Sequence, residues 1–230
     1  MLFKIFKMAS QREFVFRTWG GKRAGAGRKS KRPRPGVPHL TRPGHRAYHP
    51  VHITLRARAG LPPFRERAIL GEVQRAIARA NRVSPLSGAF RVIEFSVQND
   101  HVHFVAEAHD RVALSRGMQG LAIRLARAVN RALSSRGQVW DDRYHARDLK
   151  TPREVRNAIV YVLMNAKKHG FRVATGVDAF SSAPWFAGFS PRATLTPPPT
   201  AAPVAAPRTW LAAIGWRKRG LIRLDERPSG

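Results

Sequence analysis

The segment Gln98-Asn99-Asp100-His101-Val102-His103-Phe104-Val105-Ala106-Glu107 alternates polar and apolar side chains after a turn at Asn99-Asp100. Such alternation predicts a β-strand. Side chains two positions apart on a strand point to the same face, so His101 and His103 project together while Val102 faces the core. Two imidazoles on one face can share a metal ion. A His-x-His pair is more often an incidental surface pair, however, so these residues alone do not establish a metal site.

The segments around this strand predict a ferredoxin-like domain. Residues 51–56 alternate apolar and polar side chains as a strand does, whereas residues 64–82 repeat apolar side chains at helical spacing. The further elements that we expect are a strand from Phe90 to Val97, a helix from Ser115 to Ser135 that Gly137 ends, and a fourth strand from Trp140 to Leu149 that contains Tyr144 and His145. The order β-α-β-β-α-β indicates an α+β fold of the ferredoxin-like type.

A further helix follows this core and has clear end signals. Thr151 is the expected N-cap and Pro152 lies in the first turn. Glu154 completes a capping box, and Gly170 lies past the end of the helix. Tyr161 and Asn165 lie four residues apart on it, and therefore on one face. A tyrosine in an amphipathic helix is usually part of the core, and an asparagine usually faces water, so this pair alone favours a structural role. Together with a His-x-His strand in a strongly basic chain, the pair favours a catalytic role instead.

The charge of the chain points to a polyanionic partner. Of 230 residues, 42 are Lys or Arg and 14 are Asp or Glu, which gives a formal net charge of +28 at pH 7. A field of that sign suits nucleic acid. A high-GC genome explains a preference for Arg over Lys, but not such an excess of bases over acids. The absence of cysteine excludes disulfides, zinc thiolates and a cysteine nucleophile.

The composition divides the chain into three parts. Residues 1–48 mix glycine and proline with bases and have no apolar period, so we expect a disordered basic tail. Residues 49–170 hold the domain, and residues 171–230 hold a proline-rich linker and an extension that contains tryptophans. No apolar run reaches the length of a membrane-spanning helix, so we expect no membrane partner and a soluble cytoplasmic protein associated with the nucleoid.

Three blocks of the sequence resemble the REP-associated tyrosine transposases, a family of the HUH single-strand nucleases. The blocks are Asn99-Asp100-His101-Val102-His103-Phe104-Val105-Ala106-Glu107, Trp140-Asp141-Asp142-Arg143-Tyr144-His145 and Tyr161-Val162-Leu163-Met164-Asn165-Ala166. They follow the order and approximate spacing of the family across residues 46–170. Two positions depart from it: Ala166 stands where many relatives have Pro, and Asp100 where they usually have Asn. Neither departure removes a catalytic atom.

The resemblance implies an enzyme that nicks and rejoins single-stranded DNA, often beside a hairpin, in the manner of a transposase. Tyr161 would be the nucleophile that forms a 5′-phosphotyrosine link, with Tyr144 as a reserve nucleophile. His101 and His103, with Asn165 as a third ligand, would hold Mg²⁺ or Mn²⁺. The resemblance also makes a homodimer plausible.

Basic side chains outside this site are candidates for DNA contacts. Those in the tail and on the second helix are Lys22, Arg23, Arg28, Lys29, Arg124, Arg127 and Arg131. For each arginine taken singly, a solvated helix face is the simpler interpretation.

Two other functions fit parts of the sequence. A non-catalytic module of ferredoxin-like fold could hold nucleic-acid hairpins without cutting them. A basic structural protein of ribosomal type would explain the charge and the tail. Neither needs a tyrosine and an asparagine on a capped helix that faces a histidine pair, and both predict that the metal and Tyr161 are dispensable.

Overall fold

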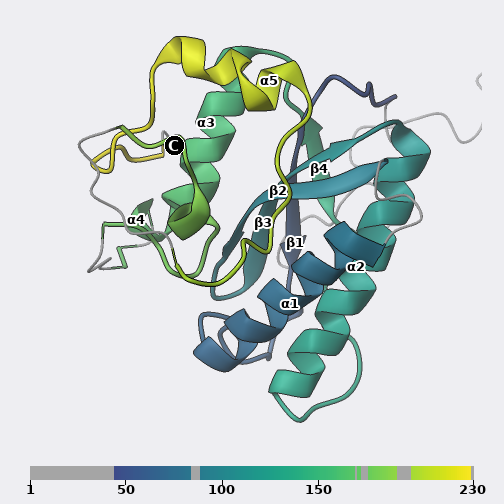
Figure 1. Ribbon diagram of the computed structural model, residues 1–230. Coiled ribbons are helices and arrows are strands. Elements are labelled where there is room, and N and C mark those ends of the chain that lie inside the picture. The colour runs from purple at the N-terminus through teal and green to yellow at the C-terminus, as the bar shows by residue number, and fades with distance from the viewer. Residues whose placement is uncertain (1–43, 84–88, 169, 172–175, 191–197, 229–230) are drawn as a thin grey trace, which may run out of the picture. The chain divides into compact units, whose positions relative to one another are not determined.

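The alternating segments of the sequence form a four-stranded antiparallel sheet in the computed structural model of the protein (Figure 1). The structure describes residues 44–83, 89–168, 170–171, 176–190 and 198–228. The strands are β1 (Val51–Arg56), β2 (Phe90–Val97), β3 (His101–Ala108) and β4 (His145–Asp148), in the order β2-β3-β1-β4. The strand that carries both histidines, β3, is therefore paired along both of its edges.

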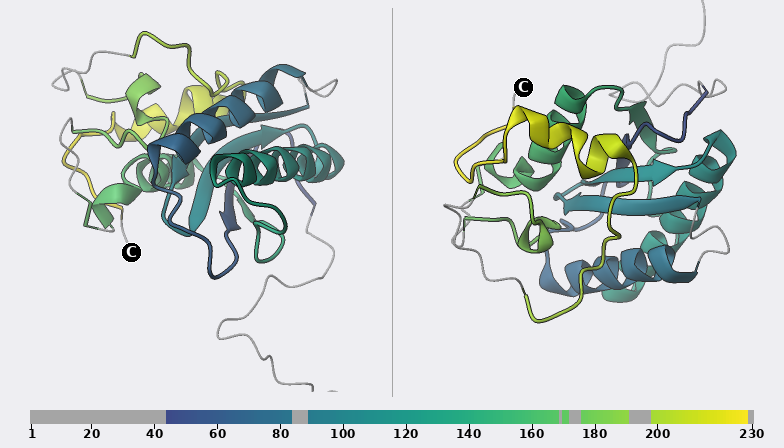
Figure 2. Two further views of the ribbon diagram at one scale, coloured as in Figure 1. Left: turned by 90° about the horizontal axis from the view of Figure 1, so that it is seen from below. Right: turned by 45° about the horizontal axis from the view of Figure 1, so that its top comes forward.

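Helices cover both faces of this sheet. On one face lie α1 (Arg67–Val83) and α2 (Arg111–Ala132) side by side, and on the other lies α3 (Pro152–Leu163) with the C-terminal residues (Figures 1 and 2). The short helices are α4 (Asn165–Lys168), α5 (Trp210–Ala213) and the 3₁₀ turns η1 (Ala183–Trp185) and η2 (Gly215–Arg219). The element order confirms the expected α+β, ferredoxin-like arrangement with a helix added after it. None of the described helices is long and apolar enough to cross a bilayer.

Each face of the sheet has its own hydrophobic core, because successive strand side chains point to opposite faces. Val102 and Phe104 of β3 are fully buried in the core that α1 and α2 close. Val105 belongs to a second core, where it joins Val162 of α3 and the buried indole of Trp216. His101 and His103 lie at alternate positions before Val105 on β3. Their side chains therefore point to the same face as Val105, which α3 covers.

The start of α2 differs from the prediction because of a side-chain cap. The helix begins at Arg111 and not at Ser115, since the carboxylate of Asp110 accepts a hydrogen bond from the Ala113 N–H at 2.8 Å. An N-cap aspartate of this kind satisfies one of the unpaired amides of the first turn. The expected start at Ser115 was set by the apolar stripe alone and is wrong by one turn.

The end of α2 and the start of α1 also differ. The last residue of α2 is Ala132, and the N–H of Leu133 closes the helix on a carbonyl one turn earlier. Gly137, which was predicted to end the helix, lies in the loop beyond it with a φ of 109°, a left-handed conformation that favours glycine.

The helix predicted over residues 64–82, α1, starts at Arg67. Phe64 is held outside it by a hydrogen bond from its N–H to the Asn99 carbonyl.

The fourth strand is shorter than predicted. Trp140 makes only an isolated bridge to Ala57, and residues 141–143 form a bend. In the bend the Arg143 N–H donates to the side chain of Asp142 at 2.7 Å, a local bond that competes with pairing in the sheet. The regular strand thus begins only at His145.

The last predicted helix is interrupted. Its capping box is confirmed at the start of α3, but α3 ends at Leu163 and α4 begins at Asn165. Between them Met164 has φ −106° and ψ 11°, outside the helical region. The prediction of one continuous helix through Tyr161 and Asn165 is therefore wrong.

Residues 176–190 and 198–228 fold back over the domain. Three of their backbone groups pair with the outer edge of β2: Ser182 N–H donates to Phe95, Ala205 N–H donates to Val92, and Phe180 accepts from Val97. An open strand edge invites pairing with other chains, so this cover protects the sheet.

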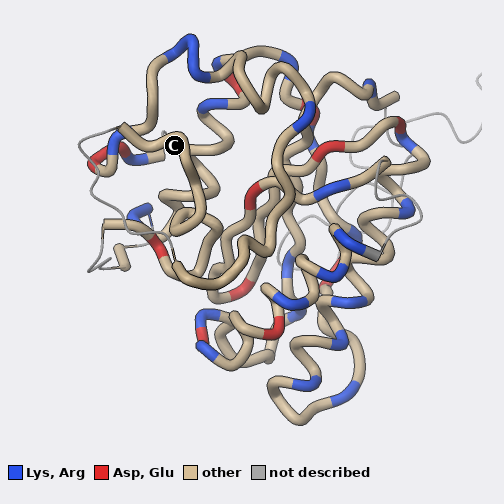
Figure 3. The backbone as a smooth tube through the Cα atoms, in the orientation of Figure 1, with Lys and Arg blue, Asp and Glu red and all other residues tan. Residues whose placement is uncertain are grey.

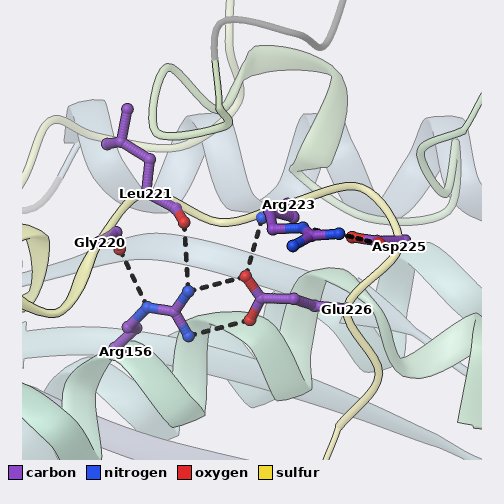
Figure 4. Close-up of polar contacts among 6 residues, drawn as sticks. All are labelled: Arg156, Gly220, Leu221, Arg223, Asp225 and Glu226. Atoms are coloured by element: carbon purple, nitrogen blue, oxygen red, sulfur yellow. Dashed lines mark hydrogen bonds and ion pairs between the residues drawn. The ribbon is translucent and has the colours of Figure 1, made fainter.

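Arg156 of α3 holds the far end of this C-terminal segment. Its guanidinium donates to both carboxylate oxygens of Glu226, at 2.9 and 2.7 Å, and to the carbonyls of Gly220 at 3.0 Å and Leu221 at 3.2 Å (Figure 4). A planar guanidinium suits such a bidentate arrangement, and a lysine ammonium does not. The segment is therefore tied to the helix that carries Tyr161.

Replacing Arg156 with Lys should lower the free energy of unfolding by about 2 kcal/mol, because charge-assisted bonds of this partly buried fork are lost. Chemical denaturation followed by circular dichroism measures the change. Arg153→Lys, at an exposed position of the same helix, is the matched control. An equal effect of the two substitutions would show that the fork contributes nothing specific.

Candidate active site

The central strand β3 places His101 and His103 on the face that α3 covers. His103 lies opposite Thr54 of β1 on one side and Ser96 of β2 on the other. Residues that oppose each other in antiparallel strands share a face, so these three side chains neighbour one another. His103 is only 4% exposed, whereas the side chain of His101, at the end of the strand, is 12% exposed. The pair thus lies where the buried face of the sheet meets solvent.

Aromatic rings from three elements gather around this pair. The ring centroids of His101 and His103 are 4.6 Å apart, and that of Tyr161 on α3 is 5.0 Å from His103. His52 of β1 completes the group, at 5.3 Å from His103 and 5.5 Å from Tyr161. We call these four residues the ring cluster. The structure therefore brings together the predicted tyrosine and both predicted histidines.

Both histidines of β3 are held through the same ring nitrogen. A hydrogen bond of 3.0 Å joins His103 Nδ1 to Thr54 Oγ1, and one of 2.6 Å joins His101 Nδ1 to a carboxylate oxygen of Asp100. Histidines that bind metals commonly use one ring nitrogen as the ligand and hold the other with an oxygen of this kind. The arrangement leaves Nε2 as the nitrogen suited to ligation in each ring.

The phenol of Tyr161 is half-buried, and its burial raises the pKa above the usual value for tyrosine. The hydroxyl therefore carries its proton at neutral pH. The ammonium of Lys168 lies 5.2 Å from the ring centroid, where a positive charge favours the phenolate. A tyrosine in this setting needs a nearby cation or base before it can act as a nucleophile.

His52 belongs to the ring cluster, although the sequence did not single it out. Burial, with smaller contributions from the positive charges of Arg147 and His145, lowers its pKa to about 4. The imidazole is therefore neutral at pH 7, and its Nε2 is buried without a hydrogen-bond partner among the described residues. Only its position in the alternating segment 51–56 hinted at it, because the register of β1 against β3 cannot be read from one sequence.

Asn165 takes no part in the ring contacts of this cluster. It is fully buried, and neither its amide oxygen nor its amide nitrogen has a hydrogen-bond partner among the described residues. Buried amides are nearly always paired, so this one is suited to a ligand or a water molecule. No three His, Cys, Asp or Glu side chains of the described part could together hold a metal ion. A metal at the histidine pair would thus need a protein ligand of another type, such as an amide.

The other predicted site residues lie elsewhere. Tyr144 is buried in the core on the side of α1 and α2, across the sheet from the ring cluster. Arg124, Arg127 and Arg131 lie on α2, also across the sheet. The predicted contacts in the tail, Lys22, Arg23, Arg28 and Lys29, fall outside the described residues.

A carboxyl group lies beside the cluster on the same face of the sheet. Glu94 of β2 lies opposite Val105 and accepts a hydrogen bond from Ser182 Oγ. Burial raises the pKa of Glu94 to about 8, although the bond from Ser182 opposes the shift. The carboxyl is thus largely protonated at pH 7.

The shift of Glu94 makes stability depend on pH. Its pKa is higher in the folded state than in the unfolded chain, so the folded state binds more protons and the free energy of unfolding falls as pH rises from about 5 to 8. Glu94→Gln should remove this loss, on the order of 3 kcal/mol, while the exposed Glu66→Gln should not. Denaturation curves at pH 5, 6.5 and 8 measure the difference. Parallel pH profiles for wild type and Glu94→Gln would contradict it.

Comparison with known proteins points to the same region. Residues 52–162 match a family model described as "Transposase IS200 like". A solved structure of a REP-associated tyrosine transposase bound to a REP hairpin has a similar fold, with a TM-score of 0.51 and 16% sequence identity. That match covers 64% of this chain and 82% of the other. A comparison with curated proteins finds no match.

The matched region contains the whole ring cluster, since it begins at His52 and ends one residue after Tyr161. The similar solved structure supports the fold described above. The resemblance to the REP-associated tyrosine transposases is thus confirmed: residues 52–162 match the model of the IS200-like transposases, and the fold is similar to that of a REP-associated tyrosine transposase.

Proposed function

We propose that this protein nicks and rejoins single-stranded DNA beside hairpins, with Tyr161 as the nucleophile. The observation that carries the proposal is the position of the Tyr161 ring, 5.0 Å from His103 in a cluster of histidines. A structural tyrosine has no need of such neighbours. The family match over the same residues supports a transposase reaction.

The reaction exchanges one ester for another. The Tyr161 oxygen attacks the phosphorus, a Tyr161–phosphate bond forms, and the bond from phosphorus to the 3′ oxygen breaks. The phenol gives up its proton and the leaving 3′ oxygen takes one up, so the step is balanced without an oxidant or reductant. Attack by another 3′-OH on the 5′-phosphotyrosine joins a new strand and restores the phenol.

The histidine pair and Asn165 fit a divalent metal such as Mg²⁺ or Mn²⁺. Each histidine is held at Nδ1 by an oxygen, and the Asn165 amide is buried without a partner among the described residues. Two imidazoles and one amide oxygen leave coordination positions open for a phosphate. When bound, the metal would polarise the phosphate and stabilise the charge on the leaving 3′ oxygen. His101 and His103 would hold it next to the Tyr161 ring.

The proposed partner is a single-stranded or hairpin DNA. The net charge of +28 suits a polyanion, and the similar solved structure was bound to a REP hairpin. We place the reaction in the cytoplasm at the nucleoid, where such DNA is found. A homodimer is part of the proposal, as for the family that the chain resembles.

A denaturing gel tests the reaction. Purified protein is mixed with hairpin-flanked single strands labelled at either end, with Mn²⁺ or with EDTA. We expect a protein–DNA adduct only with Mn²⁺, carrying the label on the 3′ side of the nick. Tight binding without an adduct on a varied set of hairpins would instead favour the binding module, which holds DNA and does not cut it.

A further inference from the structure

Polar side chains at the end of β2 lie beside the two histidines of β3. The chain continues past Val97 into Gln98, whose N–H donates to the His101 carbonyl at 2.8 Å, so these two residues oppose each other. Ser96, two residues earlier, lies opposite His103. Residues that oppose each other in antiparallel strands share a face. Ser96 and Gln98 therefore belong to the face of the sheet that carries the histidine pair.

The amide of Gln98 is buried and only partly satisfied. Gln98 is 1% exposed, and Ser96 is 0% exposed. The Gln98 Nε2 donates to Ser96 Oγ at 2.6 Å, but its Oε1 has no hydrogen-bond partner among the described residues. A buried acceptor without a donor costs free energy, so it is suited to a ligand or a water molecule. The bond to Ser96 fixes the amide and leaves its oxygen available.

Unpaired amide oxygens are rare in the part of the chain that the structure describes. Only Gln98 and Asn165 have a buried side-chain amide oxygen without a hydrogen-bond partner there. Asn165 is already a proposed ligand of the metal, whereas the reaction described above makes no use of Gln98. Amide oxygens belong to the oxygen ligands that bind Mg²⁺ and Mn²⁺. The same chemistry therefore suits both side chains.

The charge of the chain gives a further oxygen ligand a purpose. The net charge is +28, and nearby positive charge repels a divalent cation. Figure 3 shows Lys and Arg positions on the helices and loops that surround the sheet, whereas β3 itself contains neither. Two neutral imidazoles and one amide offer no negative charge to offset this repulsion. Each additional oxygen beside the histidines would strengthen binding of the cation.

We infer that Gln98 belongs to the metal site and helps His101, His103 and Asn165 to hold the divalent cation through its amide oxygen. Ser96 is then a positioning residue, because it orients the amide through the bond to Nε2. The inference rests on the proposed function for the location of the metal site. It adds a ligand from β2 to those from β3 and α4.

The test measures Mn²⁺ binding in the absence of DNA, so it needs no cleavage. The electron paramagnetic resonance signal of free Mn²⁺ gives the dissociation constant during a titration. Gln98→Met keeps the length of the side chain and removes the amide, so we expect the dissociation constant to rise about 10-fold or more. Gln119→Met is the matched control, because Gln119 is exposed on α2 across the sheet. This control should bind Mn²⁺ as wild type does.

Gln98→Glu separates a metal ligand from a structural hydrogen bond. A carboxylate offers only acceptor oxygens and adds negative charge, so it should bind Mn²⁺ at least about threefold more tightly than the amide does. Without metal, the buried charge should lower the unfolding temperature. Addition of Mn²⁺ should then raise the unfolding temperature of Gln98→Glu by more than that of wild type. A residue that only supports Ser96 would change the metal-free stability and leave the dissociation constant unchanged.

Each outcome bears on the inference. An unchanged dissociation constant in Gln98→Met would show that the amide holds only a water molecule, and would overturn it. Weaker Mn²⁺ binding by Gln98→Glu than by wild type would also overturn it, as would the absence of saturable Mn²⁺ binding by wild type. If Gln98→Met does not fold, Gln98→Glu decides alone. A wild type that binds Mn²⁺ through Gln98 but forms no DNA adduct would refute the cleavage reaction and leave the inference standing.

Discussion

Tyr161→Phe should abolish the covalent protein–DNA adduct, with a loss of at least about three orders of magnitude in nicking rate. Phenylalanine keeps the ring that packs 5.0 Å from His103 and 5.5 Å from His52, so the cluster should remain intact. It lacks the phenol oxygen that we propose as the nucleophile. Because the loss is confined to the chemical step, affinity for hairpin DNA should stay within about threefold of wild type.

Tyr144→Phe is the matched control for this variant. Tyr144 is buried in the core on the side of α1 and α2, across the sheet from the ring cluster. We expect adduct formation to persist when Tyr144 is replaced. An adduct that survives in Tyr161→Phe and disappears in Tyr144→Phe would move the nucleophile and refute our assignment.

The strands were predictable because their patterns have a period of two and end at clear turns. Val51–Arg56 and Phe90–Val97 have the predicted bounds, and so does the start of the histidine strand. His101 and His103 could be placed together because side chains two residues apart on a strand point to the same face. This alternation follows from backbone geometry and not from any contact elsewhere in the chain. The prediction of the site started from this local rule.

The parts that the sequence did not reveal depend on tertiary contacts. His52 enters the cluster only through the register of β1 against β3, and one sequence does not encode that register in a readable form. The break before Asn165 occurs at Met164, a good helix former, so no propensity marks it. Phe180, Ser182 and Ala205 cover the edge of β2 through backbone hydrogen bonds, and these carry no side-chain signature.

His103→Gln should remove metal binding and, with it, at least about 100-fold of the nicking rate. Glutamine fills most of the space of the buried imidazole and keeps a polar group opposite Thr54, so the fold should survive where alanine would leave a cavity. Thermal unfolding with and without Mn²⁺ measures metal binding apart from activity, because a ligand that binds only the folded state raises its stability. Wild type should gain stability with Mn²⁺, and His103→Gln should not.

His109→Gln supplies the control for the metal experiment. Its side chain is 75% exposed and lies beyond the end of β3, away from the ring cluster. This variant should keep both the Mn²⁺-induced stabilisation and the adduct.

Asn165→Ala tests the proposed third ligand. The buried amide of Asn165 has no partner among the described residues, so its loss should weaken the Mn²⁺ effect without breaking a hydrogen bond of the fold. A full Mn²⁺ effect in Asn165→Ala would remove Asn165 from the metal site, and a full effect in His103→Gln would remove the histidine pair as well.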